Sequence, residues 1–560
     1  MTPPPHSPSS PTSPSRRSFL ASTVVAAAAV SGGLPLLTAC GSSDSGSKEG
    51  TTSGKAAEKI LPAYAGKHML TPDLPSKNGS SAAFTQKIEL GELKQAVPEK
   101  LGKGSKFTVM APFWGTPPKG DCAYYTAMNE AIGIKATWRN QDGNTYDEKL
   151  GAVLASSDIP DVVVVPGWNL NGKIPGAVIS KFEDLGPYLS GDKVKKYPNL
   201  AAIPSDAWQR SIFGGALRGL PMPSSYVTNI VPFYRKDIFD KRGYELPKSA
   251  AQWLDLLKEI NDPKGKSWAT GDLKWAALRM FGVFSGDEKA LGWMEVDGKL
   301  TYRIETDAYL EALEWTRKVY AADLVHPDSK AVKGDERIRF AAGDHLFFCA
   351  DITAWYQMTA EQANAKGDFE VGGMDYFNHD GGDPTLWATQ PANLWAFIRK
   401  GTSKAVIRDV LATANFTAAP FGSKERMLTK YGVEGTHYEV KDGVPVKNDK
   451  GNTEVLGAFD YTGAPQSYLA QPDLPDVTRE QAKWQQRMGA FTKKSTFYGL
   501  TIAEPNRYTN LSNDFEQLED DIVRGRKKIS DMQQAVSDWK RKGGDKLRDW
   551  YTELHEKQGS

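Results

Sequence analysis

One segment of the chain restricts the possible folds more than any other. Between residues 106 and 168, three apolar runs typical of strands alternate with two amphipathic runs typical of helices. The third strand-like run contains four consecutive valines, 162–165, the pattern of a strand that is covered on both faces. Alternating strands and helices predict a parallel sheet with right-handed crossovers. We therefore expect an α/β fold.

The loops that follow these strands are where a ligand is expected, because ligands of parallel sheets bind outside the carboxyl ends of the strands. Two of these loops carry a tryptophan, Trp114 and Trp168, and Asn169 follows the second. Indole faces stack on the apolar faces of sugar rings, and amides bond to hydroxyl groups, but peptides and aromatic ligands would use similar walls. The loops therefore indicate a small organic ligand and favour a carbohydrate. The alternative is that each tryptophan simply folds onto the surface.

The first 60 residues predict export and membrane attachment. Arg16 and Arg17 precede a weakly apolar, alanine-rich run and resemble a twin-arginine signal, and 37–40 (Leu-Thr-Ala-Cys) resembles the lipobox of bacterial lipoproteins. A buried cysteine after an ordinary N-terminal helix is the alternative. We expect residues 1–39 to be a signal peptide and residues 40–60 to comprise a lipidated Cys40 and a flexible, Gly/Ser-rich tether.

Composition excludes some partners. Lys plus Arg number 69 and Asp plus Glu number 68, so no charge excess points to nucleic acid. Beyond Cys40 there are two cysteines, Cys122 and Cys349, which lie far apart in the sequence. They could pair in an oxidising compartment, but we expect them to be unpaired.

The middle of the chain carries more local signals. Residues 219–239 are extended with prolines, as in a connection between lobes. Ser249 precedes an amphipathic helix over 250–260, for which it is the expected N-cap. Further on, a strand runs directly into a helix start at Asp351.

The order of these segments is similar to the family 1 extracellular solute-binding proteins of ABC importers. The similarity is carried by GLPMP, VPFYRKDIFDKRGYELPKSAAQWLDLL and FAAGDHLFFCADITAWYQ, with support from YGVEGTHYEVKDG and the C-terminal segment 521–557. It extends from about Lys106 to Lys557 and is strongest toward the long lipoprotein subgroup for aldouronate and other oligosaccharides.

The resemblance implies a two-lobed clamp like that of periplasmic binding proteins, each lobe a mainly parallel sheet with flanking helices. The first lobe would comprise 61–228 plus 372–424, and the second 229–371 plus 425–560. Closure of the lobes on the ligand would create the shape that ABC permease subunits recognise. The resemblance also implies a monomer, held by lipid at the extracellular face of the cytoplasmic membrane.

By position, the family's ligand-binding residues fall on strand ends, crossings and the helix start of the second lobe. They are Trp114, Trp168, Asn169, Tyr226, Asp351, Trp355 and Trp387. Asp351 could instead serve only as the N-cap of its helix.

No cofactor, metal or catalytic group is expected. Some long members of the subgroup have a calcium loop after the helix over 250–260, but here Lys264 and Lys266 stand where oxygen ligands are needed. Gly-Lys-Ser at 265–267 is not a P-loop, because Ile260 replaces the upstream glycine. A glycoside hydrolase, which needs two carboxylates about 5–10 Å apart, is the main rival to a binding protein. A receptor for a peptide or another non-sugar ligand is a second alternative.

Overall fold

The computed structural model describes residues 57–559 except 88, 89, 98, 114–116, 285–288, 332, 334, 335, 363–367, 503, 506 and 509, and it leaves out the side chains of 144, 558 and 559. The predicted signal peptide and Cys40 lie outside this part. Of the predicted tether, residues 57–60 are described, and Ala57 is buried in the core of the first lobe. None of the described helices combines the length and the apolar character needed to cross a bilayer.

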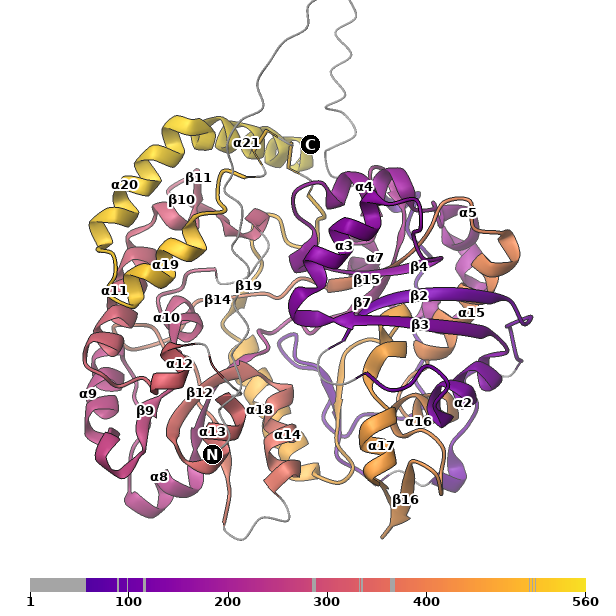
Figure 1. Ribbon diagram of the computed structural model, residues 1–560, viewed down its shortest axis with the longest axis horizontal. Helices are drawn as coiled ribbons and strands as arrows, with labels where there is room; N and C mark the ends of the chain where they lie inside the picture. Colours follow the sequence, from indigo (N-terminus) through magenta and orange to yellow (C-terminus); the bar gives the residue numbers. More distant parts are fainter. Residues whose placement is uncertain are drawn as a thin grey trace, which may run out of the picture. The chain divides into compact units, whose positions relative to one another are not determined.

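The chain forms two α/β lobes, and the first is built on a five-stranded sheet (Figure 1). Strands β2 and β3 pair in parallel, as do β2 and β4, so the predicted strand–helix alternation is confirmed. Strand β15 is antiparallel to both of its neighbours, β4 and β7. In sheet order the strands are β3 (Lys135–Asp142), β2 (Lys106–Phe113), β4 (Val162–Pro166), β15 (Ala392–Ile398) and β7 (Gly219–Pro223).

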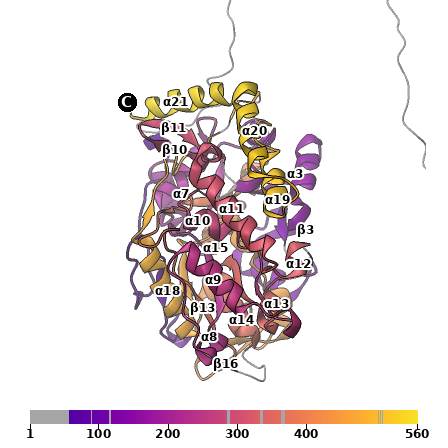
Figure 2. The ribbon, with the colours of Figure 1, turned by 90° about the vertical axis from the view of Figure 1, so that its left-hand side faces the viewer.

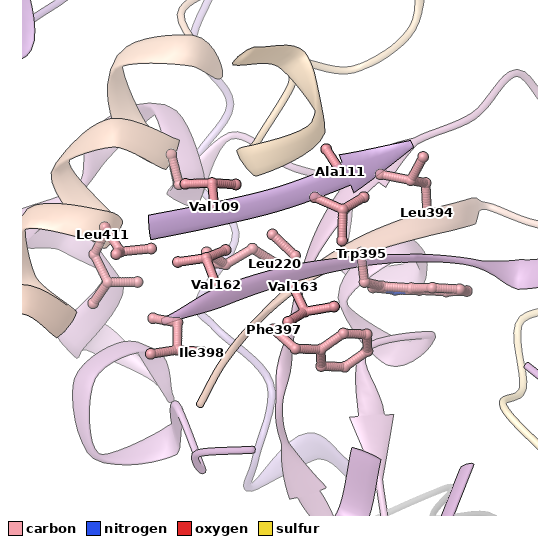
Figure 3. Packing of buried hydrophobic residues seen from close by; sticks show 14 of the residues in the cluster. Val109, Ala111, Val162, Val163, Leu220, Leu394, Trp395, Phe397, Ile398 and Leu411 are labelled. Carbon is pink, nitrogen blue, oxygen red and sulfur yellow. The ribbon is translucent and has the colours of Figure 1, made fainter. Parts of the chain in front are cut away.

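The core of the first lobe lies on both faces of this sheet, as the run of valines predicts. All four valines of β4 are inaccessible to solvent, and they pack with Trp395 and Phe397 of β15 (Figure 3). Each fully buried side chain of this size stabilises the fold by roughly 1.5–3 kcal/mol. The covering helices include α2 (Ala123–Ile132), α3 (Tyr146–Ala155), α4 (Ile174–Lys181) and α15 (Lys404–Thr417). Gly133 ends α2 in the left-handed region at φ 84°.

The second lobe has a four-stranded sheet that is mixed. The first-lobe sheet is mixed as well, with two parallel and two antiparallel pairings, so the prediction of a mainly parallel sheet in each lobe is wrong. Strand β8 is antiparallel to β12 and β13, and only β9 runs parallel to β12. The reason is that β8 starts and β12 ends at the same side of the lobe, where Ile230 pairs with Asp351. In sheet order the strands are β13 (Val371–Gly373), β8 (Ile230–Arg235), β12 (His345–Asp351) and β9 (Trp268–Thr270).

Helix α9 (Ala250–Ile260) of the second lobe confirms the sequence pattern. The Ser249 hydroxyl accepts a hydrogen bond from the Gln252 amide at 3.3 Å, and Trp253 and Leu257 are buried. The other helices here are α8 (Lys236–Arg242), α10 (Lys274–Met280), α13 (Glu336–Ala342), α14 (Thr353–Gln362) and α18 (Pro475–Gly489).

A helical layer with its own core completes the second lobe. Figures 1 and 2 show α19 and α20 beside α11, and the layer buries Trp293, Trp539 and Tyr551 together. Its elements are β10 (Trp293–Val296), β11 (Lys299–Tyr302), α11 (Asp307–Ala321), α19 (Phe515–Val523), α20 (Ile529–Trp539) and α21 (Asp545–Gly559).

The later crossings between the lobes occur further along the chain than the sequence predicted. Residues 374–386 pack in the core of the second lobe, and Val455 and Phe459 pack in that of the first. The hinge includes residues 224–229 and the parallel pair β14 (Leu386–Trp387) and β19 (Thr492–Lys493). These placements depend on contacts between distant segments, which local periodicity does not report.

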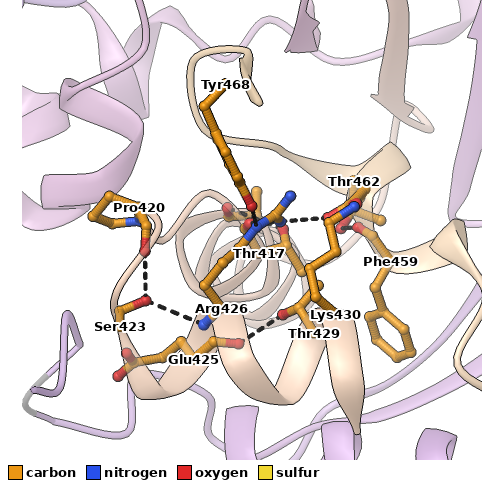
Figure 4. Close-up of polar contacts among 12 residues, drawn as sticks. Thr417, Pro420, Ser423, Glu425, Arg426, Thr429, Lys430, Phe459, Thr462 and Tyr468 are labelled. Atoms are coloured by element: carbon orange, nitrogen blue, oxygen red, sulfur yellow. Dashed lines mark hydrogen bonds and ion pairs between the residues drawn. The ribbon is translucent and has the colours of Figure 1, made fainter. Parts of the chain in front are cut away.

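A buried polar network ties the segment after residue 424 to the first lobe (Figure 4). Arg426 of α16 (Lys424–Tyr431) forms an ion pair with Asp460 at 2.7 Å and donates to the hydroxyl of Tyr468 at 2.7 Å and the carbonyl of Thr417 at 3.3 Å. Both charged groups are almost fully buried, so each depends on the other for compensation.

Cys122 and Cys349 are free thiols, as predicted. They belong to different lobes: Cys122 directly precedes α2 in the first, and Cys349 lies on β12 in the second.

Candidate functional site

Two adjoining cavities form a cleft between the lobes, here called the inter-lobe cleft. The larger, of about 560 Å³, lies between the loop after β4 and the helical layer of the second lobe. The smaller, of about 310 Å³, lies at the hinge and includes Thr228 and Trp387. Both are lined by Trp275, which therefore stands where they meet. These volumes are typical of small-molecule sites, which range from roughly 300 to 1,000 Å³.

The first lobe contributes Trp168 to this cleft. Strand β4 ends at Pro166, and the single turn Gly167–Asn169 presents the indole of Trp168, which is 37% exposed. A β-carbon on Gly167 would come within 1.8 Å of the Asn393 side-chain oxygen. A larger residue at this position would displace the Asn393 side chain, so glycine allows the turn to lie close to β15.

The second lobe contributes Trp275, which is partly exposed on the short helix α10. The preceding residue anchors that helix: the buried Lys274 ammonium lies 2.8 Å from Asp520 and 3.5 Å from Glu519 of α19. Arg279 donates to the carbonyl of Trp275 at 3.0 Å. The position of Trp275 is thus set by charge pairs that are removed from water.

Other aromatic groups complete the wall formed by the helical layer. Tyr551 of α21 lines the larger cavity, donates its hydroxyl to Glu504 at 2.9 Å and packs on Trp293 at a centroid distance of 5.0 Å. Tyr302 and Phe515 of the same layer line this cavity, and Phe213 lines it from the first lobe. The cavity is thus lined by both aromatic and polar side chains, as a ligand with both characters requires.

The remaining predicted residues lie in several environments. Trp114 lies outside the described residues. Asn169 is buried below the Trp168 turn, and its side-chain oxygen has no hydrogen-bond partner within the described part. Tyr226 lies at the hinge, where its hydroxyl donates to the Thr492 carbonyl at 3.3 Å and its ring packs against Gly79. It lines neither cavity of the cleft.

Besides Tyr226, three predicted residues belong to the second lobe or the hinge: Trp387, Asp351 and Trp355. Trp387 lines the smaller cavity and donates its indole N–H to the Gly282 carbonyl at 2.8 Å. The Asp351 carboxylate accepts from the backbone N–H and hydroxyl of Thr353 at the start of α14, at 2.9 and 2.7 Å, and also bonds Asn229. Asp351 thus bonds the first residue of α14 from the end of β12, two positions before the helix begins, rather than from the N-cap position, and it lines neither cavity of the cleft.

Trp355 is 6% exposed and packs edge-on against Phe233 in the core of the second lobe. The structure thus brings Trp168 and Trp387 to the cleft, joined by Trp275, Tyr551 and Glu504, which the sequence did not single out. Trp275 had a usable signal, because it opens a helix just after a buried strand. Tyr551 and Glu504 had none.

Side chains of the loop at 261–272 accept hydrogen bonds from the loop's own backbone. The Asp262 carboxylate accepts from the Gly265 N–H, and the Asn261 side-chain oxygen from the Ala269 N–H, both at 3.0 Å. Across the described residues, no three or more His, Cys, Asp or Glu side chains gather as a metal site would require.

Proteins of known structure share this architecture. No protein-family model matches the chain. The lipoprotein LipO of Bacillus subtilis is 24% identical over 479 residues, which cover 79% of this chain and 91% of LipO. The alginate-binding protein AlgQ2, solved without calcium ion, superposes with a TM-score of 0.61 over 83% of this chain and all of AlgQ2, at 14% identity.

The substrate-binding protein FusA of an S. pneumoniae ABC transporter, solved in complex with kestose, has a TM-score of 0.58. The match covers 81% of this chain and 100% of FusA, at 14% identity. The chain has the two-lobed fold of solute-binding proteins.

Proposed function

We propose that the protein is a lipid-anchored solute-binding protein that captures an oligosaccharide in the inter-lobe cleft and delivers it to an ABC permease. The observation that carries the proposal is one cleft with aromatic side chains from both lobes, Trp168 from the first and Trp275 from the second. The sugar-binding neighbours AlgQ2 and FusA and the lipoprotein LipO support it.

Capture by lobe closure follows from how the cleft is built. A ligand that touches both lobes prefers the closed arrangement, so binding shifts the open–closed equilibrium. The hinge consists of short extended segments, including 224–229 and the β14–β19 pair, which can absorb backbone rotation while both cores stay intact.

Membrane attachment rests on the N-terminal sequence. A lipidated Cys40 followed by a Gly/Ser-rich tether would hold the receptor at the outer face of the membrane, near its permease. Ala57, the first described residue, packs in the core of the first lobe, so the tether would join this lobe.

A glycan-active enzyme is the second candidate, because Glu504 lies beside the larger cavity in a setting typical of catalytic acids. Burial raises the pKa of this carboxyl, and the charge of Lys289 offsets the effect in part. Its partner in such an enzyme would be a second carboxylate. Glu519 is held by Lys274 and Arg303, whereas Glu516, which lines the same cavity, is exposed and would be the candidate. The solved neighbours AlgQ2 and FusA are binding proteins, so we expect bound glycans to be recovered intact, and product formation would favour the enzyme.

The proposal is tested by calorimetric titration against neutral and acidic oligosaccharides and short peptides. Trp168→Ala should weaken binding of the best sugar about thirtyfold or more, because truncated aromatic anchors cost ~2 kcal/mol or more. The melting temperature should stay the same, since the indole is partly exposed. Trp268→Ala is the control, because Trp268 lies on β9 and lines neither cavity of the cleft. Peptide binding without sugar binding would refute the proposed ligand class.

A further inference from the structure

The charged groups around the inter-lobe cleft nearly balance in sign. Among the described residues, the two cavities are lined by four basic side chains and three carboxylates: Arg210, Arg279, Lys289, Arg303, Glu504, Glu516 and Glu519. Formal charge alone therefore does not tell whether the site takes a neutral or an acidic sugar. The answer depends on which of these groups already have partners.

The two arginines of the larger cavity that come from opposite lobes are both engaged. Arg210 is 2% exposed, and its guanidinium donates to the carbonyls of Ala392 and Leu500 and to the hydroxyl of Thr501. Arg303 forms an ion pair with Glu519 at 3.6 Å and donates to the Phe284 carbonyl at 3.2 Å. A ligand carboxylate would have to displace these acceptors.

The other two cations are engaged as well. Lys289 donates to the Asn513 side-chain oxygen at 3.1 Å. Arg279, at the smaller cavity, donates to the Thr228 hydroxyl at 3.2 Å and to the Trp275 carbonyl at 3.0 Å. These donors fix the walls of the cleft.

The three carboxylates of the cleft differ in whether they already have partners. Glu519 is almost fully buried and accepts from the Tyr309 hydroxyl at 2.6 Å, besides its ion pairs, while Glu504 accepts from Tyr551. Glu516, in the first turn of α19, is exposed and makes no hydrogen bond or ion pair within the described part of the chain. Among the charged side chains that line the cleft in the described part of the chain, the exposed one without a hydrogen-bond or ion-pair partner is thus an anion, Glu516.

We propose that the inter-lobe cleft selects uncharged oligosaccharides and discriminates against uronic-acid sugars, with Glu516 as a specificity-determining acceptor of sugar hydroxyls. This inference rests on the proposed function. Hydroxyl groups donate charge-assisted hydrogen bonds to a carboxylate, whereas a sugar carboxylate beside Glu516 meets like charge and finds the cations occupied. Neutral and acidic sugars could both stack on Trp168 and Trp275, so stacking would not change the difference in affinity between them.

The test compares sugars of equal length that differ in charge. Calorimetric titrations of the mature chain would use xylotetraose against xylotriose carrying one glucuronic acid, mannotetraose against tetramannuronate, and kestose. We expect binding of at least one neutral sugar, with its acidic counterpart about tenfold weaker or more. The difference should narrow as ionic strength rises, because salt screens the repulsion.

A matched pair of variants isolates the role of Glu516. Glu516→Gln should reduce the ratio of neutral-sugar affinity to acidic-sugar affinity about threefold or more. Glu439→Gln, which removes the same charge from the exposed strand β16 (Tyr438–Lys441), should leave it unchanged. Tighter binding of an acidic sugar than of its neutral counterpart would overturn the inference while supporting the proposed function. Failure of every sugar to bind would overturn the proposed function, and the inference with it.

Discussion

The C-terminal helix α21 forms part of the cleft wall, and one buried carboxylate holds it in place. Glu305, with its side chain 6% exposed, accepts from Arg548 of α21 at 2.6 Å and lies 2.9 Å from the Lys540 ammonium. It also accepts from the Tyr302 amide at 3.0 Å. We predict that Glu305→Gln destabilises the protein, because it removes the charge that compensates two cations while keeping the shape of the side chain.

The size of the effect follows from burial. Removing one partner of a fully buried ion pair costs about 3–5 kcal/mol. The side chains of Arg548 and Lys540 are 19% and 41% exposed, so water compensates part of their charge. We therefore expect a loss of about 2 kcal/mol in the free energy of unfolding at pH 7.

The loss should also depend on pH. Burial alone would raise the pKa of Glu305, but the hydrogen bonds from Lys540 and Arg548 outweigh it and lower the pKa. A carboxyl with a lowered folded-state pKa stabilises the fold fully above its unfolded value of about 4.3, and this contribution disappears as pH falls through the folded value. The difference between wild type and variant should thus be constant from pH 7 to pH 5 and shrink below pH 4.

Urea unfolding of both proteins across this pH range measures the effect. Glu553→Gln on the same helix is the control, because the Glu553–Lys557 pair is exposed and should contribute close to nothing. If the two variants lose the same stability at pH 7, or if the Glu305→Gln deficit persists unchanged at low pH, the reasoning from buried charge is refuted.

Three further predictions concern the anchor, the loop at 261–272 and the core of the second lobe. Cys40→Ala should release the protein from the membrane fraction or leave it unprocessed, and unchanged partitioning would contradict lipid anchoring. EDTA should leave the melting temperature and sugar affinity unaltered, and a loss restored by calcium would show that the loop at 261–272 binds the ion despite Lys264 and Lys266. Trp355→Ala should cost about 3 kcal/mol of stability, because its ring packs on Phe233 in the core, and should leave the sugar affinity of the folded fraction intact. Unchanged stability with a loss of sugar affinity would make Trp355 a ligand contact.

Local sequence patterns predict the elements of the first lobe well. The strand–helix alternation and the stop at Gly133 each depend on residues within one or two turns, and both appear in the structure. The Ser249 cap of the second lobe is equally local and also appears. The positions of the lobe crossings depend on which distant strands pair, such as β13 with β8, and these pairings leave no local trace.

The residues of the candidate site also differ in whether the local sequence predicts their positions. Trp168 follows a buried strand, so its place at a sheet edge could be expected from the sequence. Trp355 also follows a strand, four residues after the end of β12, yet the rotation of α14 turns its indole into the core. The direction of one side chain cannot be predicted from the pattern of so short a helix. Tyr551 reaches the cleft only because α21 packs across the layer formed by β11 and η8 (Arg303–Glu305), far away in sequence.

The central claim is that a sugar is held between the lobes by aromatic side chains of both. A crystal structure of the protein with the tightest oligosaccharide from the titrations tests it most directly. The account predicts sugar rings in the inter-lobe cleft, in contact with both Trp168 and Trp275 and with a hydroxyl on Glu516. A sugar bound to one lobe only, for instance in the shallow cavity of about 660 Å³ beside Trp355, would contradict it.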